Sequence, residues 1–154
     1  MGMSDKSRSM IAASQSAPTG GKRSGFRTLV GYRTLVWRDG YAEIVLDVGP
    51  VEKSGIVHGG VYATLLDAAC GHAATWVSVE GNIRRCVTLS LTTSFLATAR
   101  SGPLVAVGRL EAIRDRVGTL TAEVRDDAGT VFAVGQASFR YERGSERTEG
   151  VSRT

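Results

Sequence analysis

His58, Gly59 and Gly60 precede a long apolar segment, residues 61–79, in which Asp67 is the single formally charged residue. The first N–H groups of a helix have no partner within the helix and carry a partial positive charge. Glycines lack a Cβ atom, so a substrate oxygen can approach such N–H groups closely. A carboxylate in apolar surroundings is costly unless it is paired or has a chemical role. These residues together indicate an oxyanion site and a carboxylate base or nucleophile, the groups that acyl transfer requires.

Both features also have a purely structural interpretation. The glycine pair can form a tight turn into a helix, and Asp67 can be tied to a structural partner, although no basic residue lies nearby in the sequence. Along a helix, Gly59 and Asp67 lie about 12 Å apart. One carbonyl group cannot contact both ends of that span.

The elements that must position these residues can be predicted from turns and hydrophobic periodicity. The folded region begins near Phe26 with two strands joined at the Asp39–Gly40 turn. A helix over residues 59–79 follows, and it is apolar nearly all round, which predicts that it is buried. Consecutive strands with short links form an antiparallel sheet, so we expect an α+β fold with a curled antiparallel sheet wrapped around one long central α-helix. The four strands expected after the helix span residues 86–98, 103–113, 118–129 and 130–142.

The segment HGGVYATLLDAACG, residues 58–71, between a hairpin and four strands, resembles the corresponding segment of the hotdog-fold acyl-CoA thioesterases. It is most similar to their phenylacetate-pathway, or PaaI-like, branch, and the resemblance covers roughly residues 26–142. It implies hydrolysis of acyl-CoA to free acid and CoA, with no metal or other cofactor. It also implies a homodimer in which Asp67 of one subunit serves the helix start of the other, as a base or as a nucleophile. Pairing of dimers into a homotetramer is common in the family.

The resemblance assigns roles to three further positions. Thr88 matches a Ser or Thr position that helps to hold the attacking water, although a plain strand threonine is the alternative. His58 is either a structural residue of the loop–helix corner or a general base. Relatives often carry an Asn six residues before the His, where this chain has Glu52. Glu52 is therefore either a surface residue or a second carboxylate in the substrate-binding site.

Three arginines, Arg84, Arg85 and Arg100, lie at predicted strand ends and are candidates for binding the CoA phosphates. A solvated surface position is the alternative for each. Two other functions fit the fold, a non-catalytic acyl-CoA binding module and an acyl-thioester hydratase or dehydratase. The second is disfavoured because it uses an Asp-x-x-x-x-His pair, whereas here the acid follows the His by nine residues.

The charge distribution argues against a nucleic-acid partner. Residues 1–27 contain five basic residues and one acidic residue, which gives 5 − 1 = +4, the net charge of the whole 154-residue chain. The folded part therefore has no net charge and no basic stripe. We expect residues 1–25 to form a disordered basic tail and residues 143–154 to form a polar C-terminal tail that frays.

Composition also bears on the cellular compartment. No apolar stretch is typical of a membrane span or of a secretory signal. We therefore expect a cytoplasmic protein with no membrane partner. Cys70 and Cys86 lie in apolar segments and are expected to be reduced thiols, and their spacing from the histidines fits no metal-binding pattern.

Overall fold

The structure, a computed structural model, describes residues 25–49 and 55–153. Its elements follow the predicted order of a β-hairpin, a helix and four strands, with one short helix added before the hairpin. None of the described helices is both long and apolar enough to cross a membrane. In chain order the elements are α2 (Gly25–Val30), β1 (Arg33–Arg38), β2 (Tyr41–Val48), α3 (Gly59–Thr75), β3 (Cys86–Phe95), β4 (Gly102–Arg114), β5 (Val117–Arg125) and β6 (Val131–Tyr141).

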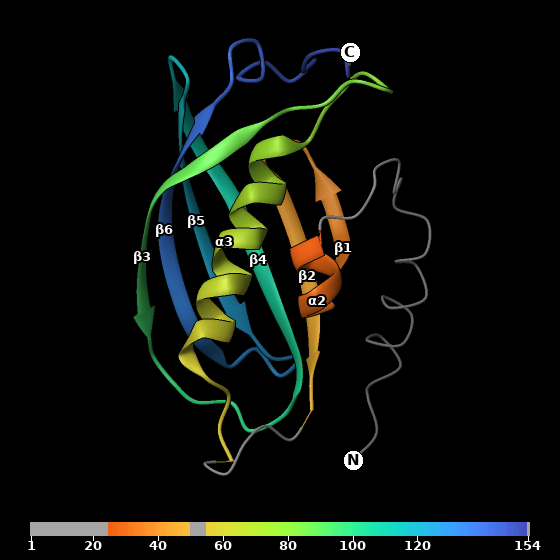
Figure 1. Ribbon diagram of the computed structural model, residues 1–154. Helices are drawn as coiled ribbons and strands as arrows, with labels where there is room; N and C mark the ends of the chain where they lie inside the picture. Colours follow the sequence, from red (N-terminus) through yellow and green to blue (C-terminus); the bar gives the residue numbers. More distant parts are fainter. Residues whose placement is uncertain (1–24, 50–54, 154) are drawn as a thin grey trace.

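The six strands of the described residues form one antiparallel sheet in the order β1-β2-β4-β5-β6-β3. The sheet curls around α3, which lies in its hollow side (Figure 1). The Asp39–Gly40 turn joins β1 and β2, and Gly40 has a positive φ of 63°, a conformation that favours glycine. The predicted α+β fold, a curled antiparallel sheet around one central helix, is confirmed.

β3 is an edge strand, although β4 follows it in the chain. Within the described chain it pairs only with β6, and residues 96–101 carry the chain past the N-terminal end of α3 to β4 (Figure 1). Ala99 holds this crossing segment. Its carbonyl oxygen accepts the Val57 N–H at 2.8 Å, and its N–H donates to Tyr62 Oη at 2.8 Å. The edge strand β3 thus lies next to α3, the helix that carries Asp67.

The buried side of α3 lies very close to the sheet. A Cβ at Gly108 of β4 would lie 2.3 Å from the Ala69 carbonyl oxygen, so only glycine fits at this position. The many small residues of α3 allow this close contact, and each buried leucine adds about 1.5–3 kcal/mol of hydrophobic stabilisation. The helix residues with no exposed surface are Leu65, Leu66, Ala69, Cys70, Ala73 and Ala74.

α3 ends at Thr75, whereas the sequence predicts a helix that runs to about Val79. Trp76 leaves helical geometry with a ψ of 140°. The Ser78 N–H donates to the Thr148 carbonyl oxygen at 2.8 Å instead of to a carbonyl of the preceding helical turn. The predicted helix end is wrong because the chain after Thr75 bonds to a segment that is distant in the sequence.

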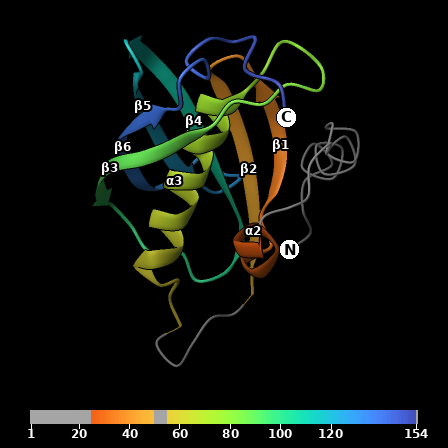
Figure 2. The ribbon, with the colours of Figure 1, turned by 45° about the horizontal axis from the view of Figure 1, so that its top comes forward.

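The C-terminal segment, residues 143–153, lies against the loop that follows α3 (Figure 2). Ile83 and Val151 exchange two backbone hydrogen bonds of 2.9 Å. Asn82 Nδ2 donates to the Glu149 carbonyl oxygen at 2.9 Å, across 67 positions of sequence. The prediction of a fraying tail is wrong for these residues, because local composition carries no information about such distant partners.

Arg84 joins the end of α3 to the C-terminal segment and is only 5% exposed. Its Nη1 donates to the Trp76 carbonyl oxygen at 2.8 Å, and its Nε donates to the Ser145 carbonyl oxygen at 2.8 Å. Its Nη2 donates to the Glu146 carbonyl oxygen at 3.2 Å, and the guanidinium lies 5.0 Å from the centre of the Tyr141 ring. The predicted role in phosphate binding does not fit this residue, because all three of its nitrogens are engaged in the interior.

Arg84→Met should lower the free energy of unfolding by about 2–4 kcal/mol, because three backbone carbonyl oxygens lose a charged donor. Urea denaturation followed by circular dichroism measures the change. Arg85→Met is the control, because Arg85 is exposed and its ion pair with Glu142 is 3.5 Å long. That substitution should change the free energy by less than about 0.5 kcal/mol. Equal effects of the two substitutions would contradict the role assigned to Arg84.

Candidate active site

The side chain of His58 caps the N-terminal end of α3. His58 has extended backbone geometry, with φ −65° and ψ 139°, and its Nδ1 accepts the Gly60 N–H at 2.9 Å. Its carbonyl oxygen accepts the Val61 N–H at 2.9 Å. Among the described residues, no acceptor takes the Gly59 N–H. The helix start therefore offers one free glycine donor, from Gly59, where the sequence predicts two.

An aromatic side chain of β3 lies beside Gly59. A Cβ at Gly59 would lie 3.5 Å from the Phe95 ring, which is an ordinary van der Waals distance. The Phe95 ring centre lies 6.3 Å from that of Tyr62, and Tyr62 stacks on Phe132 at 6.2 Å. Phe95 is itself 56% exposed. This aromatic group thus supports the helix start on one side and is open to solvent on the other.

Asp67 lies in the middle of α3 and is half-buried, although the sequence predicts that it is buried. The difference arises because the sheet covers only one side of α3 and because β3 is an edge strand. Thr88 Oγ1 of β3 donates to Asp67 Oδ1 at 2.8 Å. Within the described chain, no donor reaches Oδ2 and no basic side chain forms an ion pair with the carboxylate. A carboxylate held by one oxygen and open at the other can take a proton from water or attack a carbonyl carbon.

The two cysteine thiols near Asp67 are poor nucleophiles. Burial, with the charge of Asp67 as a second cause, raises the pKa of Cys70 to about 12. Burial also raises the pKa of Cys86 to about 11. Both are free thiols, as predicted. Because the thiolate is the reactive form of cysteine, burial disfavours both cysteines as nucleophiles.

A single chain does not bring Gly59 and Asp67 together. They are about 12 Å apart along the axis of α3. Gly59 faces Phe95 at the C-terminal end of β3, whereas Asp67 bonds to Thr88 near the N-terminal end of the same strand. The described chain therefore places the free helix start and the open carboxylate toward opposite ends of β3.

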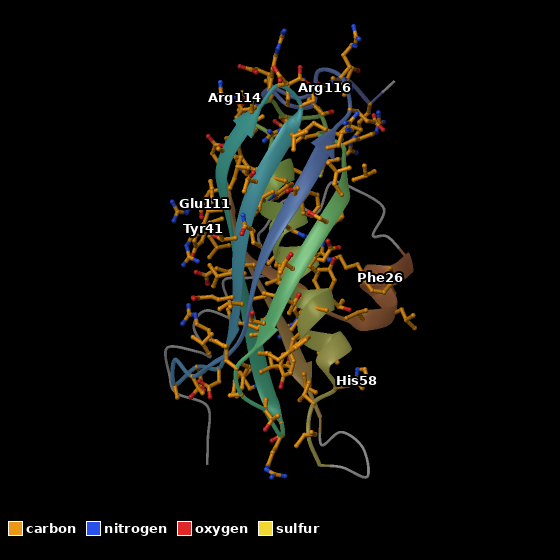
Figure 3. The ribbon with its side chains drawn as sticks, turned by 90° about the vertical axis from the view of Figure 1, so that its left-hand side faces the viewer. Phe26, Tyr41, His58, Glu111, Arg114 and Arg116 are labelled. Atoms are coloured by element: carbon orange, nitrogen blue, oxygen red, sulfur yellow. The ribbon has the colours of Figure 1, made fainter. Side chains whose placement is uncertain are left out.

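The outer edge of β3 is unpaired within the described chain, and exposed apolar side chains alternate there with exposed serines and threonines. Figure 3 shows β3, in green, crossing in front of α3. An unpaired apolar edge strand is a template for pairing with another chain. The exposed large apolar residues of this region are Val87 (61%), Leu89 (51%), Phe95 (56%), Leu96 (60%) and Val134 (36%).

Two other predicted site residues, Arg100 and Arg85, are exposed and lie apart. Arg100 is near the start of α3, where its Nη1 donates to the Gly55 carbonyl oxygen at 3.3 Å. Arg85 precedes β3 at the other end of that strand. Glu52, the remaining predicted substrate-binding residue, lies outside the described residues. Of these three residues, the structure therefore places only Arg100 near the start of α3, where the Gly59 N–H is free within the described chain.

Sequence reasoning does not identify Phe95 and Tyr62 as neighbours of the site. The alternation over residues 86–98 places Phe95 on the apolar face of a strand but does not show that this strand ends beside Gly59. Tyr62 is the only aromatic residue of α3, which is a weak signal that it has a specific partner. That partner is the Ala99 N–H. It can be identified only when β3 is known to lie at the edge of the sheet, because the segment that connects β3 to β4 then passes the helix start.

Solved structures of several bacterial proteins share this fold. Conserved protein PA5202 from Pseudomonas aeruginosa has a TM-score of 0.70 and 24% identity, over 82% of this chain and 100% of that chain. A phenylacetic acid degradation-related protein from Ralstonia eutropha JMP134 has a TM-score of 0.69 and 23% identity, over 87% and 97% of the two chains. Thioesterase HI1161 from Haemophilus influenzae has a TM-score of 0.68 and 17% identity, over 77% and 83%. The predicted hotdog fold is confirmed.

Two sequence comparisons identify the family. VNG_1336C of Halobacterium salinarum, which is named as a candidate esterase, is 35% identical over 109 residues, or 67% of this chain and 70% of that protein. A family model described as the thioesterase superfamily matches residues 54–133, which include the helix start, Asp67 and Thr88. The chain therefore belongs to the thioesterase superfamily.

Proposed function

We propose that the protein hydrolyses acyl-CoA thioesters to free acids and CoA, as a member of the PaaI-like branch of its superfamily. Membership of the thioesterase superfamily supports thioester hydrolysis in general. The observation that carries the finer proposal is the Asp67 carboxylate, which Thr88 holds by one oxygen while the other is open. The likeness to the phenylacetic acid degradation-related protein is consistent with the branch.

In the proposed reaction Gly59 supplies the oxyanion donor. The thioester oxygen accepts the Gly59 N–H, for which no described residue competes. This oxygen gains negative charge as the carbonyl carbon becomes tetrahedral, and the partial positive charge of the helix start favours that change. One such donor is worth about 3–4 kcal/mol in the transition state.

Asp67 acts on the carbonyl carbon by one of two routes. As a base, it takes a proton from a water molecule whose oxygen bonds to the carbon. The C–S bond then breaks, and the proton is transferred to the leaving sulfur. As a nucleophile, the carboxylate oxygen bonds to the carbon and displaces the thiolate, and water hydrolyses the resulting mixed anhydride. Either route requires the open Oδ2 atom and gives the same products.

Each complete site in this proposal is formed by two copies of the chain. Antiparallel pairing of two β3 edges about a two-fold axis brings the Phe95 end of one strand to the Thr88 end of the other. Gly59 of one subunit then approaches Asp67 of the partner subunit, and the exposed apolar residues of the edge become covered. A homodimer therefore has two equivalent sites. Pairing of two dimers into a tetramer stays a prediction from the family resemblance.

Arg100 and Arg85 are the arginines that we propose for the CoA phosphates. Both are exposed, and they lie toward opposite ends of β3. In an antiparallel pair of β3 strands, Arg85 of the partner subunit is brought to the end that carries Arg100. Two guanidinium groups would then face the mouth of one site, where phosphate groups bind well.

A panel of acyl-CoA substrates tests the proposed function. Aryl, aryl-acetyl and medium to long aliphatic acyl-CoAs are incubated with the protein, and the released thiol is measured with a chromogenic reagent. Release above the uncatalysed rate for at least one acyl class supports the proposal. Binding of an acyl-CoA without release of thiol would instead favour a non-catalytic binding module.

A further inference from the structure

His58 makes the N–H groups at the start of α3 unequal. Its Nδ1 takes the Gly60 N–H and its carbonyl oxygen takes the Val61 N–H, each at 2.9 Å. The Gly59 N–H is left without an acceptor in the described part of the chain. Without the imidazole, Gly60 would present a second free donor one position along the helix. A thioester oxygen would then have two competing places to bind.

The two glycines of this turn are needed for different reasons. A Cβ at Gly60 would lie 3.0 Å from His58 Nδ1 and 3.4 Å from Cε1, which is tight enough that the ring would have to shift by a few tenths of an ångström. A Cβ at Gly59 would meet only the Phe95 ring, at 3.5 Å. Gly60 therefore makes room for the cap, whereas Gly59 keeps space beside the free donor.

We infer that His58 is a positioning residue of the proposed thioesterase: its Nδ1 captures the Gly60 N–H, fixes the first turn of α3 and leaves the Gly59 N–H as the single donor for the thioester oxygen. This inference rests on the proposed function. It separates the two interpretations that the sequence leaves open for His58, because a ring that is engaged as a helix cap is not the general base.

The cap also determines where the imidazole carries its proton. A ring nitrogen that accepts a hydrogen bond has no proton of its own, so neutral His58 is protonated on Nε2. Figure 3 shows His58 at the N-terminal end of α3 with its side chain on the outside of the molecule. The ring is exposed, and its position acts on the reaction through the backbone that it holds.

Two substitutions of His58 separate capping from direct contact with substrate. His58→Asn retains a cap, because the Asn side-chain oxygen accepts N–H groups of the first helical turn, whereas His58→Ala has no acceptor. For the best acyl-CoA of the panel, His58→Ala should lower kcat about tenfold or more and change KM by less than about twofold, since the lost geometry matters most in the transition state. His58→Asn should recover kcat to within about threefold of the wild-type value.

A second measurement needs no substrate. ¹⁵N-labelled wild-type protein should show the Nε2–H tautomer of the neutral His58 ring, with an unprotonated Nδ1, in long-range imidazole spectra. Gly60→Ala should weaken this signature because the added methyl group forces the ring to shift by a few tenths of an ångström. The cap is supported if Nδ1 of His58 accepts a hydrogen bond in the wild-type protein and this hydrogen bond is weakened in Gly60→Ala.

Each outcome has a defined meaning. Equal loss of kcat in His58→Asn and His58→Ala would overturn the inference, because the imidazole itself would then contact the reacting groups. A wild-type ring protonated on Nδ1 would overturn the cap. Absence of thioesterase activity in the wild type would overturn the proposed function, and with it the positioning role, while the spectra would still decide whether His58 caps α3.

Discussion

Asp67→Asn should lower kcat for thioester hydrolysis by about 10²–10⁴-fold in a protein that remains folded. The fold should be retained because the Asn oxygen can still accept the hydrogen bond from Thr88 Oγ1, which is 2.8 Å long in the wild type. The amide nitrogen that replaces Oδ2 can neither take a proton from water nor attack a carbonyl carbon. Steady-state rates on the best acyl-CoA, with thermal unfolding as the test of folding, measure the effect.

A matched control makes the Asp67 result specific. Asp47→Asn is the same chemical change at an exposed residue of β2, where the carboxylate pairs with Arg33 at 2.9 Å. Its kcat should stay within about twofold of the wild-type value, as expected for a surface ion pair remote from the reaction. A folded Asp67→Asn protein that hydrolyses thioesters at the wild-type rate would remove Asp67 from the chemistry.

Leu89→Glu should convert the protein to monomers and lower kcat/KM by about 100-fold or more, because an unpaired charge would be buried at the interface between β3 edges. Leu89 is 51% exposed in the single chain, so the substitution removes little packing within a subunit. Size-exclusion chromatography with light scattering gives the oligomeric state, and the acyl-CoA assay gives the rate. Both changes should appear together because each proposed site is formed by two subunits.

Gln136→Glu is the control for the edge substitution. Gln136 is exposed on β6, the strand next to β3, and the variant introduces the same charged residue. It should leave both the oligomeric state and the activity unchanged. A dimeric, fully active Leu89→Glu protein would contradict the pairing of β3 edges.

The fold could be predicted from the sequence where local patterns determine it. The Asp39–Gly40 turn, the alternating strands and the small apolar residues of the helix act over short distances, and their predicted order is confirmed. The short helix α2 was not predicted. Neither was the position of β3 at the far edge of the sheet, because the sequence does not show that residues 96–101 cross beneath the helix start.

Errors in the predicted ends of elements share a physical cause. The helix stops at Thr75 and the C-terminal segment is folded because each bonds to a distant part of the chain. Arg84 is the clearest example, since its charge and its position at a strand end suggest an exposed anion-binding residue. Its actual acceptors are carbonyl oxygens up to 62 positions away, which charge and spacing do not reveal.

The candidate site could be predicted in part. Asp67 and the glycine pair stand out by composition alone. The structure brings Thr88 to Asp67 as a hydrogen-bond donor, whereas the resemblance implies that Thr88 holds the attacking water. The unequal roles of Gly59 and Gly60 could not be predicted, because they depend on the rotamer of the His58 ring. Half-burial of Asp67 follows from the open edge of β3 and was also not predictable.

Mixing two inactive variants tests the shared site most directly. Gly59→Ala should fold, because the new methyl group lies at an ordinary distance of 3.5 Å from Phe95, but it crowds the oxyanion donor. A mixed dimer with Asp67→Asn has one site with both mutations and one site with neither. After subunit exchange at equal concentrations, half of the dimers are mixed. We predict recovery to about a quarter of the wild-type activity, whereas activity that stays at the level of the separate variants would contradict a site formed by Gly59 of one subunit and Asp67 of the partner subunit.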